Sequence, residues 1–301
     1  DRQVTIPLRN LKIKPGVEYF LNLHVKTKKP ALFAPAGYIV ASEQFQIPVT
    51  TPKPVYQAAP EPVLSMEENG PEIRISNPDM EFVFHKQKGY VTSYRVKGVQ
   101  YIADDFGFQP NFWRGATDND YGNGMPHRLQ AWKQAGKNFK IAGIRTSAST
   151  ISTNLTITYR LQESNTRYHV SYTIYPSGYL NVACHLEANP NAPEIPRIGT
   201  RFRVPSDLNQ MEYFGRGPEE NYRDRNHGTL VEHYKSTAEQ QYVPYVRPQE
   251  NGHKTDVRWL ALTDKTGKGL LFVADSNLME FNVSRNRIED FDSEESTSPY
   301  Q

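Results

Sequence analysis

The chain has 301 residues and a nearly balanced charge, with 35 Lys and Arg against 33 Asp and Glu. Both signs are mixed along the sequence rather than gathered in blocks, so nothing predicts a nucleic-acid partner. The 18 Tyr and 14 Phe can build a core, which argues against a disordered chain. No apolar run approaches the roughly 20 residues that a membrane-spanning helix needs, so we expect no membrane association.

The first part of the chain, residues 1–50, contains strand-like segments at 4–8, 18–28 and 38–49, separated by turn signals rich in proline and glycine. So few strands leave two unpaired edges and cannot form an independent sandwich. We interpret residues 1–50 as part of an immunoglobulin-like domain whose first strands are missing. The proline-rich stretch 51–63 predicts a stiff linker.

The remainder, residues 64–301, is a series of short runs in which apolar and polar residues alternate. The clearest run is 155–161 (LTITYRL), and the runs at 168–174 and 180–186 repeat its pattern. Such strands, joined by short turns, predict a large antiparallel sandwich with at most one or two short helices. We expect a helix at 127–136, ended by Gly136, and we expect Cys184 to face the core.

Hydrolysis of a glycosidic bond needs two carboxyl groups that face each other across the sugar, roughly 5 to 10 Å apart. The obvious acidic pairs are Asp104-Asp105, Glu219-Glu220 and Glu294-Glu295. Adjacent residues in an extended turn project in different directions, so none of these pairs can flank one bond. The sequence therefore predicts no catalytic residue in this chain.

The segment 111–124 ends in a turn where Asp118, Asn119 and Asp120 are expected to accept hydrogen bonds from backbone amides two residues on. A calcium loop does not fit, because Gly122 and Leu129 stand where oxygen ligands belong. The histidines lack the spacing of a zinc site. We predict no metal site.

The stretch 213–252 is the richest in candidate site residues. Gly215 and Gly217 allow a positive φ or a close backbone approach, and the nearby Arg216, Arg223 and Arg225 are expected to pair locally with the acids of the same loop. Its amides, carboxylates and aromatic rings would suit a hydroxyl-rich ligand, although bracing of the sandwich without ligand contact is the favoured alternative. The candidate carbohydrate-binding residues are Arg216, Glu219, Asn221, Tyr222, Glu250, Asn251 and His253.

Motifs in this chain resemble the C-terminal region of family-two β-galactosidases. The motif EQFQIP at 43–48 is similar to the end of their immunoglobulin-like domain four. Segments similar to domain five follow in family order: WRGATDNDYG at 113–122, PRIG at 196–199, GRGPEENYRDR at 215–225, PYVRPQENG at 244–252 and FNVS at 281–284. For residues 64–301 the resemblance implies the supersandwich shared with galactose mutarotases, here without its final strands.

The resemblance also implies a bacterial parent that hydrolyses terminal β-galactosides by the retaining route, with two glutamates in a TIM barrel that this chain lacks. The implied partners are the barrel and N-terminal domains of the same polypeptide, with β-galactoside bound through the parent. No cofactor is expected in this fragment, because the Mg and Na of the family would be held mostly outside it. A homo-oligomer and the compartment, bacterial cytoplasm or periplasm, are left open.

Two rival functions remain at this point. One is a stand-alone mutarotase-like enzyme, which needs a His and a Glu that converge on a sugar ring. The other is a carbohydrate-binding or purely structural module.

Overall fold

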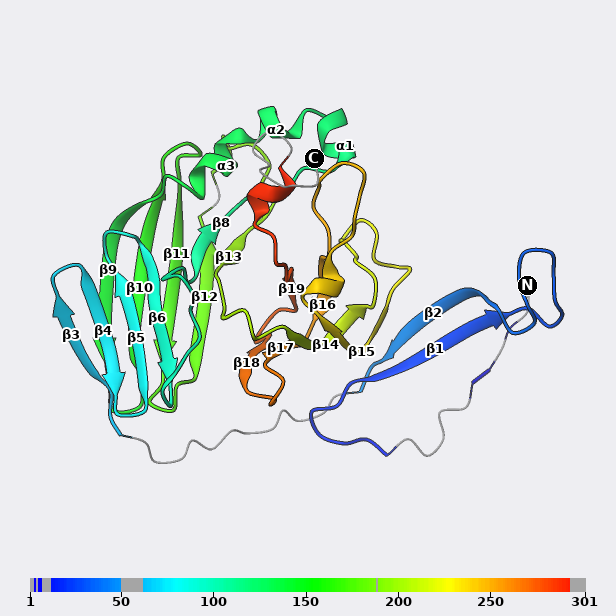
Figure 1. The fold of residues 1–301 in the computed structure, drawn as a ribbon, viewed down its shortest axis with the longest axis horizontal. Coiled ribbons are helices and arrows are strands. Elements are labelled where there is room, and N and C mark those ends of the chain that lie inside the picture. Colours follow the sequence, from blue (N-terminus) through cyan, green and yellow to red (C-terminus); the bar gives the residue numbers. More distant parts are fainter. Residues whose placement is uncertain (1–2, 4, 7–11, 50–61, 188, 293–301) are drawn as a thin grey trace.

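The computed structural model describes residues 3, 5–6, 12–49, 62–187 and 189–292. Its first elements are β1 (Tyr19–Lys26) and β2 (Ile39–Ile47), which pair antiparallel as a hairpin projecting to one side of a larger β body (Figure 1). The strands predicted at 18–28 and 38–49 are therefore confirmed. The strand predicted at 4–8 and the linker predicted at 51–63 fall largely outside the described residues.

The body begins with two antiparallel sheets that stack face to face (Figure 1). Tyr172 from one sheet packs against Phe82 from the other with ring centroids 5.3 Å apart, and the apolar residues between the layers form one large core. The five-stranded sheet consists of β3 (Ser65–Asn69), β4 (Glu72–Asn77), β5 (Met80–His85), β6 (Tyr90–Val96) and β7 (Val99–Gln100), in that order. The facing sheet has the order β12 (Leu180–Leu186), β11 (Thr166–Ile174), β10 (Thr153–Leu161), β9 (Lys140–Ala148).

A second four-stranded sheet continues the body and carries the loops of the candidate site. Its order is β15 (Leu230–Thr237), β14 (Gln210–Gly217), β17 (Trp259–Thr263), β18 (Gly269–Val273). Two separate strand pairs complete the body: β8 (Gln109–Asn111) with β13 (Gly199–Arg201), and β16 (Lys254–Val257) with β19 (Met279–Phe281). Met211, Tyr213 and Leu260 are among the residues of its smaller core. The all-β sandwich class predicted from the sequence is confirmed.

Helical structure is confined to short pieces. The described residues contain α1 (Asp118–Gly122), α2 (Met125–Arg128) and α3 (Gln130–Ala135), with the 3₁₀ turns η1 (Glu239–Gln241) and η2 (Ile288–Phe291). The single helix expected at 127–136 is thus two helices that meet at Leu129. The turn expected at Asp118 is α1, because Thr117 and Asp120 form a capping box that starts a helix there. None of the described helices is long and apolar enough to span a membrane.

The apolar residues that alternate with polar ones along β10 face the core, as the sequence predicted. Leu155, Ile157, Tyr159 and Leu161 are all completely buried. Cys184 lies opposite the buried Val170, so it is on the core side of its sheet as predicted. The residue is nevertheless exposed rather than part of the buried core, because β12 is an edge strand.

Candidate functional site

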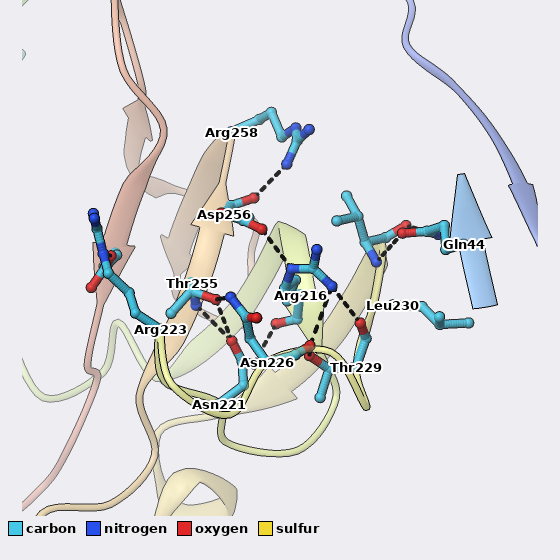
Figure 2. Close-up of polar contacts among 12 residues, drawn as sticks. Gln44, Arg216, Asn221, Arg223, Asn226, Thr229, Leu230, Thr255, Asp256 and Arg258 are labelled. Carbon is cyan, nitrogen blue, oxygen red and sulfur yellow. Dashed lines mark hydrogen bonds and ion pairs between the residues drawn. The ribbon is translucent and has the colours of Figure 1, made fainter. Parts of the chain in front are cut away.

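The candidate residues lie on β14 and on two loops that meet beside it: the loop after β14, residues 218–229, and the segment before β16, residues 242–253 (Figure 2). The structure brings most of them together around Asn221 and His253. Glu219 differs, because its side chain is exposed while its carbonyl oxygen accepts a hydrogen bond from Asn221 Nδ2 at 3.1 Å. We call the following residues the loop network: Arg216, Glu220, Asn221, Tyr222, Glu250, Asn251, His253, Asp256 and Glu280.

Asn221 is completely buried, and its side-chain amide is occupied by backbone and side-chain partners (Figure 2). Its Nδ2 donates to the carbonyls of Arg216 and Glu219, both at 3.1 Å. Its Oδ1 accepts from Thr255 N at 3.0 Å and Thr255 Oγ1 at 2.6 Å. An amide offers two donors and two acceptor sites, so this side chain retains nothing for a ligand. Asn221 ties the two loops together.

The arginines of the loop reach further than the sequence predicted. Arg216 Nε donates to Asp256 Oδ2 at 2.5 Å, and its Nη1 donates to the carbonyl oxygens of Asn226 and Thr229 (Figure 2). Arg223 pairs with Glu280, 57 residues away in sequence. The expected local pairing holds only for Arg225, whose Nη2 contacts Glu220 Oε1 at 2.6 Å. It fails for the others because antiparallel strands bring distant acids closer than the neighbouring ones.

Glu220 joins the loops from the other side. Its side chain is buried and accepts hydrogen bonds from Arg225, Tyr245 Oη and Gly252 N, the last at 2.8 Å. Burial alone would raise the pKa of this carboxyl, but the hydrogen bonds from Tyr245, Arg225 and Gly252 lower it below its usual value. Glu219 and Glu220 therefore face different surroundings, as expected for adjacent residues in a turn.

His253 is held on every side. Its Nδ1 lies 2.7 Å from Asn282 Oδ1, its Nε2 lies 2.9 Å from Glu280 Oε2, and its ring stacks on Tyr222 with centroids 5.1 Å apart. The hydrogen bond from His253, together with Arg223, lowers the pKa of Glu280 to about 2. Burial raises the pKa of Tyr222, whose hydroxyl is buried and makes no hydrogen bond with the described residues.

Glu250 and Asn251 extend the contacts toward the helical end of the body. Glu250 is buried and accepts from Arg197 Nη2 at 2.6 Å and from Gly115 N at 3.1 Å. Asn251 Nδ2 donates to the Gln249 carbonyl oxygen at 3.0 Å, and its Oδ1 accepts from Val243 N at 3.3 Å. Both side chains therefore hold backbone segments in place.

Gly215 is required by close packing rather than by its φ, which is not positive. A Cβ at this position would lie 2.7 Å from Val257 Cγ2 and 2.9 Å from Val257 Cα. Strand β14 can therefore lie against β16 only if this position carries no side chain. Of the two explanations that the sequence allowed, close approach is the one observed.

The sequence did not single out Lys254 as part of this arrangement. Lys254 is buried, and its Nζ donates to Gln241 Oε1 at 2.8 Å and to the Gly252 carbonyl oxygen at 3.2 Å. Burial lowers the pKa of this lysine to about 8. Nothing in the local pattern around Lys254 marks it as buried, since it lies on a short strand interrupted by an irregular register.

The chemistry open to this arrangement is restricted. Glu220, Glu250 and Glu280 are each occupied by cationic or backbone donors, and Glu219 is exposed and apart. A carboxyl that acts as general acid needs a raised pKa, whereas those of Glu220 and Glu280 are lowered. In the described ranges, no group of three or more His, Cys, Asp or Glu could hold a metal ion.

Two known protein families match this chain. The family described as "Beta galactosidase small chain" matches residues 76–301, and the one described as "Beta-galactosidase, domain 4" matches residues 1–48. The chain belongs to the β-galactosidase family. The hairpin and the body thus correspond to two consecutive parts of β-galactosidases, and the resemblance drawn from the sequence motifs is confirmed.

Relatives named β-galactosidase match most of this chain. The one from Priestia megaterium is 35% identical over 254 residues, which are 84% of this chain and 24% of the relative. The relative from Streptococcus thermophilus is 26% identical over 95% of this chain and 28% of the relative. The one from Lactobacillus delbrueckii subsp. bulgaricus is 29% identical over 92% of this chain and 27% of the relative. The chain therefore spans about a quarter of the length of these β-galactosidases.

Proposed function

We propose that this chain is the non-catalytic C-terminal region of a β-galactosidase that hydrolyses terminal β-D-galactose residues. In this proposal the two catalytic glutamates of the retaining mechanism lie in a barrel elsewhere in the polypeptide. The chain holds part of the wall of the galactoside site and supports assembly with the remaining domains. The proposal assigns no metal ion to this chain.

The observation that carries the proposal is the use of the polar groups in the loop network. Asn221, Glu220 and Glu250 are directed to backbone groups of neighbouring loops, and they are buried or nearly so. Groups that bind a substrate must offer free hydrogen-bonding capacity toward an open space, which these side chains do not. Their arrangement suits a rigid support.

The surface that the network supports has the composition of a protein contact. Tyr245 is anchored through its hydroxyl to Glu220, and Arg247 lies over the Tyr121 ring at 3.7 Å. Between them Val246 is fully exposed. Tyr and Arg are among the residues that dominate binding energy at interfaces, and the exposed Val246 adds apolar surface beside them. We assign this loop, residues 242–248, to contact with the rest of the polypeptide.

A chimera tests the proposal. The chain would replace the segment that it matches in the Priestia megaterium relative, and hydrolysis of a chromogenic β-galactoside would be measured for the chimera, the same relative without that segment, and the isolated chain. We expect activity in the chimera and none in the isolated chain. Val246→Asp should lower the activity of the chimera, whereas Val99→Asp, at an exposed valine on the five-stranded sheet, serves as the matched control.

Hydrolysis by the isolated chain would contradict the proposal, because the barrel would then be unnecessary. A folded chimera that is no more active than the relative without the segment would also contradict it. Circular dichroism of each protein distinguishes this result from a failure to fold.

A further inference from the structure

The outward face of the five-stranded sheet carries a groove that the loop network does not share. The groove has a volume of about 410 Å³ and is lined by polar side chains from β4, β5 and β6, with Gln100 of β7 at one side. In Figure 1 this sheet lies on the opposite side of the body from β14 and β15. The groove is therefore separate from the candidate site described above.

A ladder of hydrogen bonds crosses the groove at right angles to the strands. Gln100 Nε2 donates to Ser93 Oγ at 2.7 Å, and Ser93 Oγ donates to Glu81 Oε1 at 3.2 Å. Arg74 pairs with Glu81 on the same ladder, and its Nη2 contacts Glu72 Oε2 at 3.2 Å. Four neighbouring strands thus hold a fixed row of alternating donors and acceptors that remains partly open to solvent.

Further groups around the ladder retain hydrogen-bonding capacity. His85 uses Nδ1 to accept from Lys88 N at 3.2 Å, which leaves Nε2 as its available ring nitrogen. The exposed Arg95 guanidinium makes no ion pair within the described part of the chain. These groups can bind a ligand without breaking contacts that hold the fold.

The backbone is also irregular at this groove. The pairing of β5 with β6 shifts register between Val83 and Phe84, so Thr92 is an extra residue in β6 and lines the groove. Such bulges are frequent beside binding sites, because they redirect a side chain. At the rim, Asp105 has φ 51°, a left-handed conformation that is costly for a residue other than glycine.

The charges around the groove balance, which indicates the class of ligand. Arg74, Lys88 and Arg95 supply cations, and Glu72, Glu81 and Asp105 supply carboxylates. A surface with equal numbers of both charges favours neither an anion nor a cation, whereas each hydroxyl of a sugar can donate and accept along such a ladder. Small-molecule sites have volumes of roughly 300–1,000 Å³, a range that includes this groove. We propose that the groove binds a short neutral saccharide of one or two sugar units.

The proposal does not rest on the galactosidase assignment, and it is tested on the chain alone. Saturation-transfer NMR with lactose and with galactose should show binding with a Kd of roughly 1–10 mM, weak because the described residues that line the groove include no Phe, Tyr or Trp. Arg95→Ala and Glu81→Gln should each weaken binding by about tenfold. Arg145→Ala is the matched control, because Arg145 is an exposed arginine on the polar face of the facing sheet, opposite Thr156.

Backbone amide shifts caused by the sugar should gather at Ser93 and Gln100. The inference is overturned if neither sugar binds, if both groove variants bind as well as the unmodified chain, or if the shifts map to residues 218–253 instead. Circular dichroism of Arg95→Ala and Glu81→Gln checks that each variant remains folded.

Discussion

The loop network and the groove on the five-stranded sheet are both rich in polar side chains, yet they use them differently. In the loop network, Asn221 and Glu250 are buried and bond to backbone groups of other segments. In the groove, Ser93, Glu81 and Arg74 bond mainly to one another and remain partly exposed. Polar composition alone therefore does not identify a ligand site. The kind of partner and the degree of burial separate a support from a surface that can bind.

The largest expected effect is the loss of the amide that ties the loops together. Asn221→Ala would remove the side-chain partner of the buried Thr255 N and of the carbonyl groups of Arg216 and Glu219. We expect the free energy of unfolding to fall by about 4 kcal/mol, since each orphaned group costs about 1–3 kcal/mol. Urea denaturation measures this free energy of unfolding. The comparison is Arg95→Ala in the groove, which should change it by less than about 0.5 kcal/mol. Equal losses in both variants would remove the distinction between the two regions.

Packing beneath the loop network gives the next effect. Gly215→Ala would place a Cβ 2.9 Å from the Val257 backbone, so β14 and β16 would have to separate. We expect a loss of about 2 kcal/mol in the free energy of unfolding. Gly228→Ala is the matched control, because nothing lies within 4 Å of a Cβ there. If the two alanine variants are equally stable, the close approach is not a constraint.

Acid should weaken the loop network through Glu280. Its pKa is about 2 in the folded chain against an ordinary value of 4.5, so its contribution is fully present above pH 4.5 and is lost as the pH falls toward 2. We expect this contribution to be about 2 kcal/mol, because the side chain is partly exposed and its charge is screened. Thermal unfolding from pH 6 down to pH 3 should show a smaller drop in Tm for Glu280→Gln than for the unmodified chain. If Tm falls equally with pH in both proteins, His253 and Arg223 do not lower the pKa of Glu280 in the folded chain.

The smallest effect is expected where the loop network meets solvent. Tyr245→Phe removes one hydrogen bond to Glu220 and should cost about 1 kcal/mol. Glu219→Ala, at the exposed neighbour of Glu220, should leave the unfolding midpoint unchanged in urea. A larger loss for Glu219→Ala than for Tyr245→Phe would mean that the exposed side of the turn stabilises the fold.

Local patterns were sufficient for the strands but not for the contacts between them. Alternation identified β10, because each buried side chain in Leu155–Leu161 is separated by a polar one. It also placed Cys184 on the core side of β12, but a sequence does not show that β12 is an edge strand. The pairing of Arg216 with Asp256 depends on strand order in the same way. The helix that starts after Thr117 was predicted only as a turn, although its capping box joins residues three apart in the sequence, whereas the burial of Lys254 depends on distant segments.

The central claim is that the loop network is a permanent brace rather than a surface that forms around sugar. Amide hydrogen exchange at Asn221 and Thr255 tests it most directly, since their N–H groups donate to the His253 carbonyl oxygen and to Asn221 Oδ1. The account predicts protection as high as that of the buried strand β10, unchanged when galactose is added. Rapid exchange in the free chain, or protection that develops only with galactose, would contradict it.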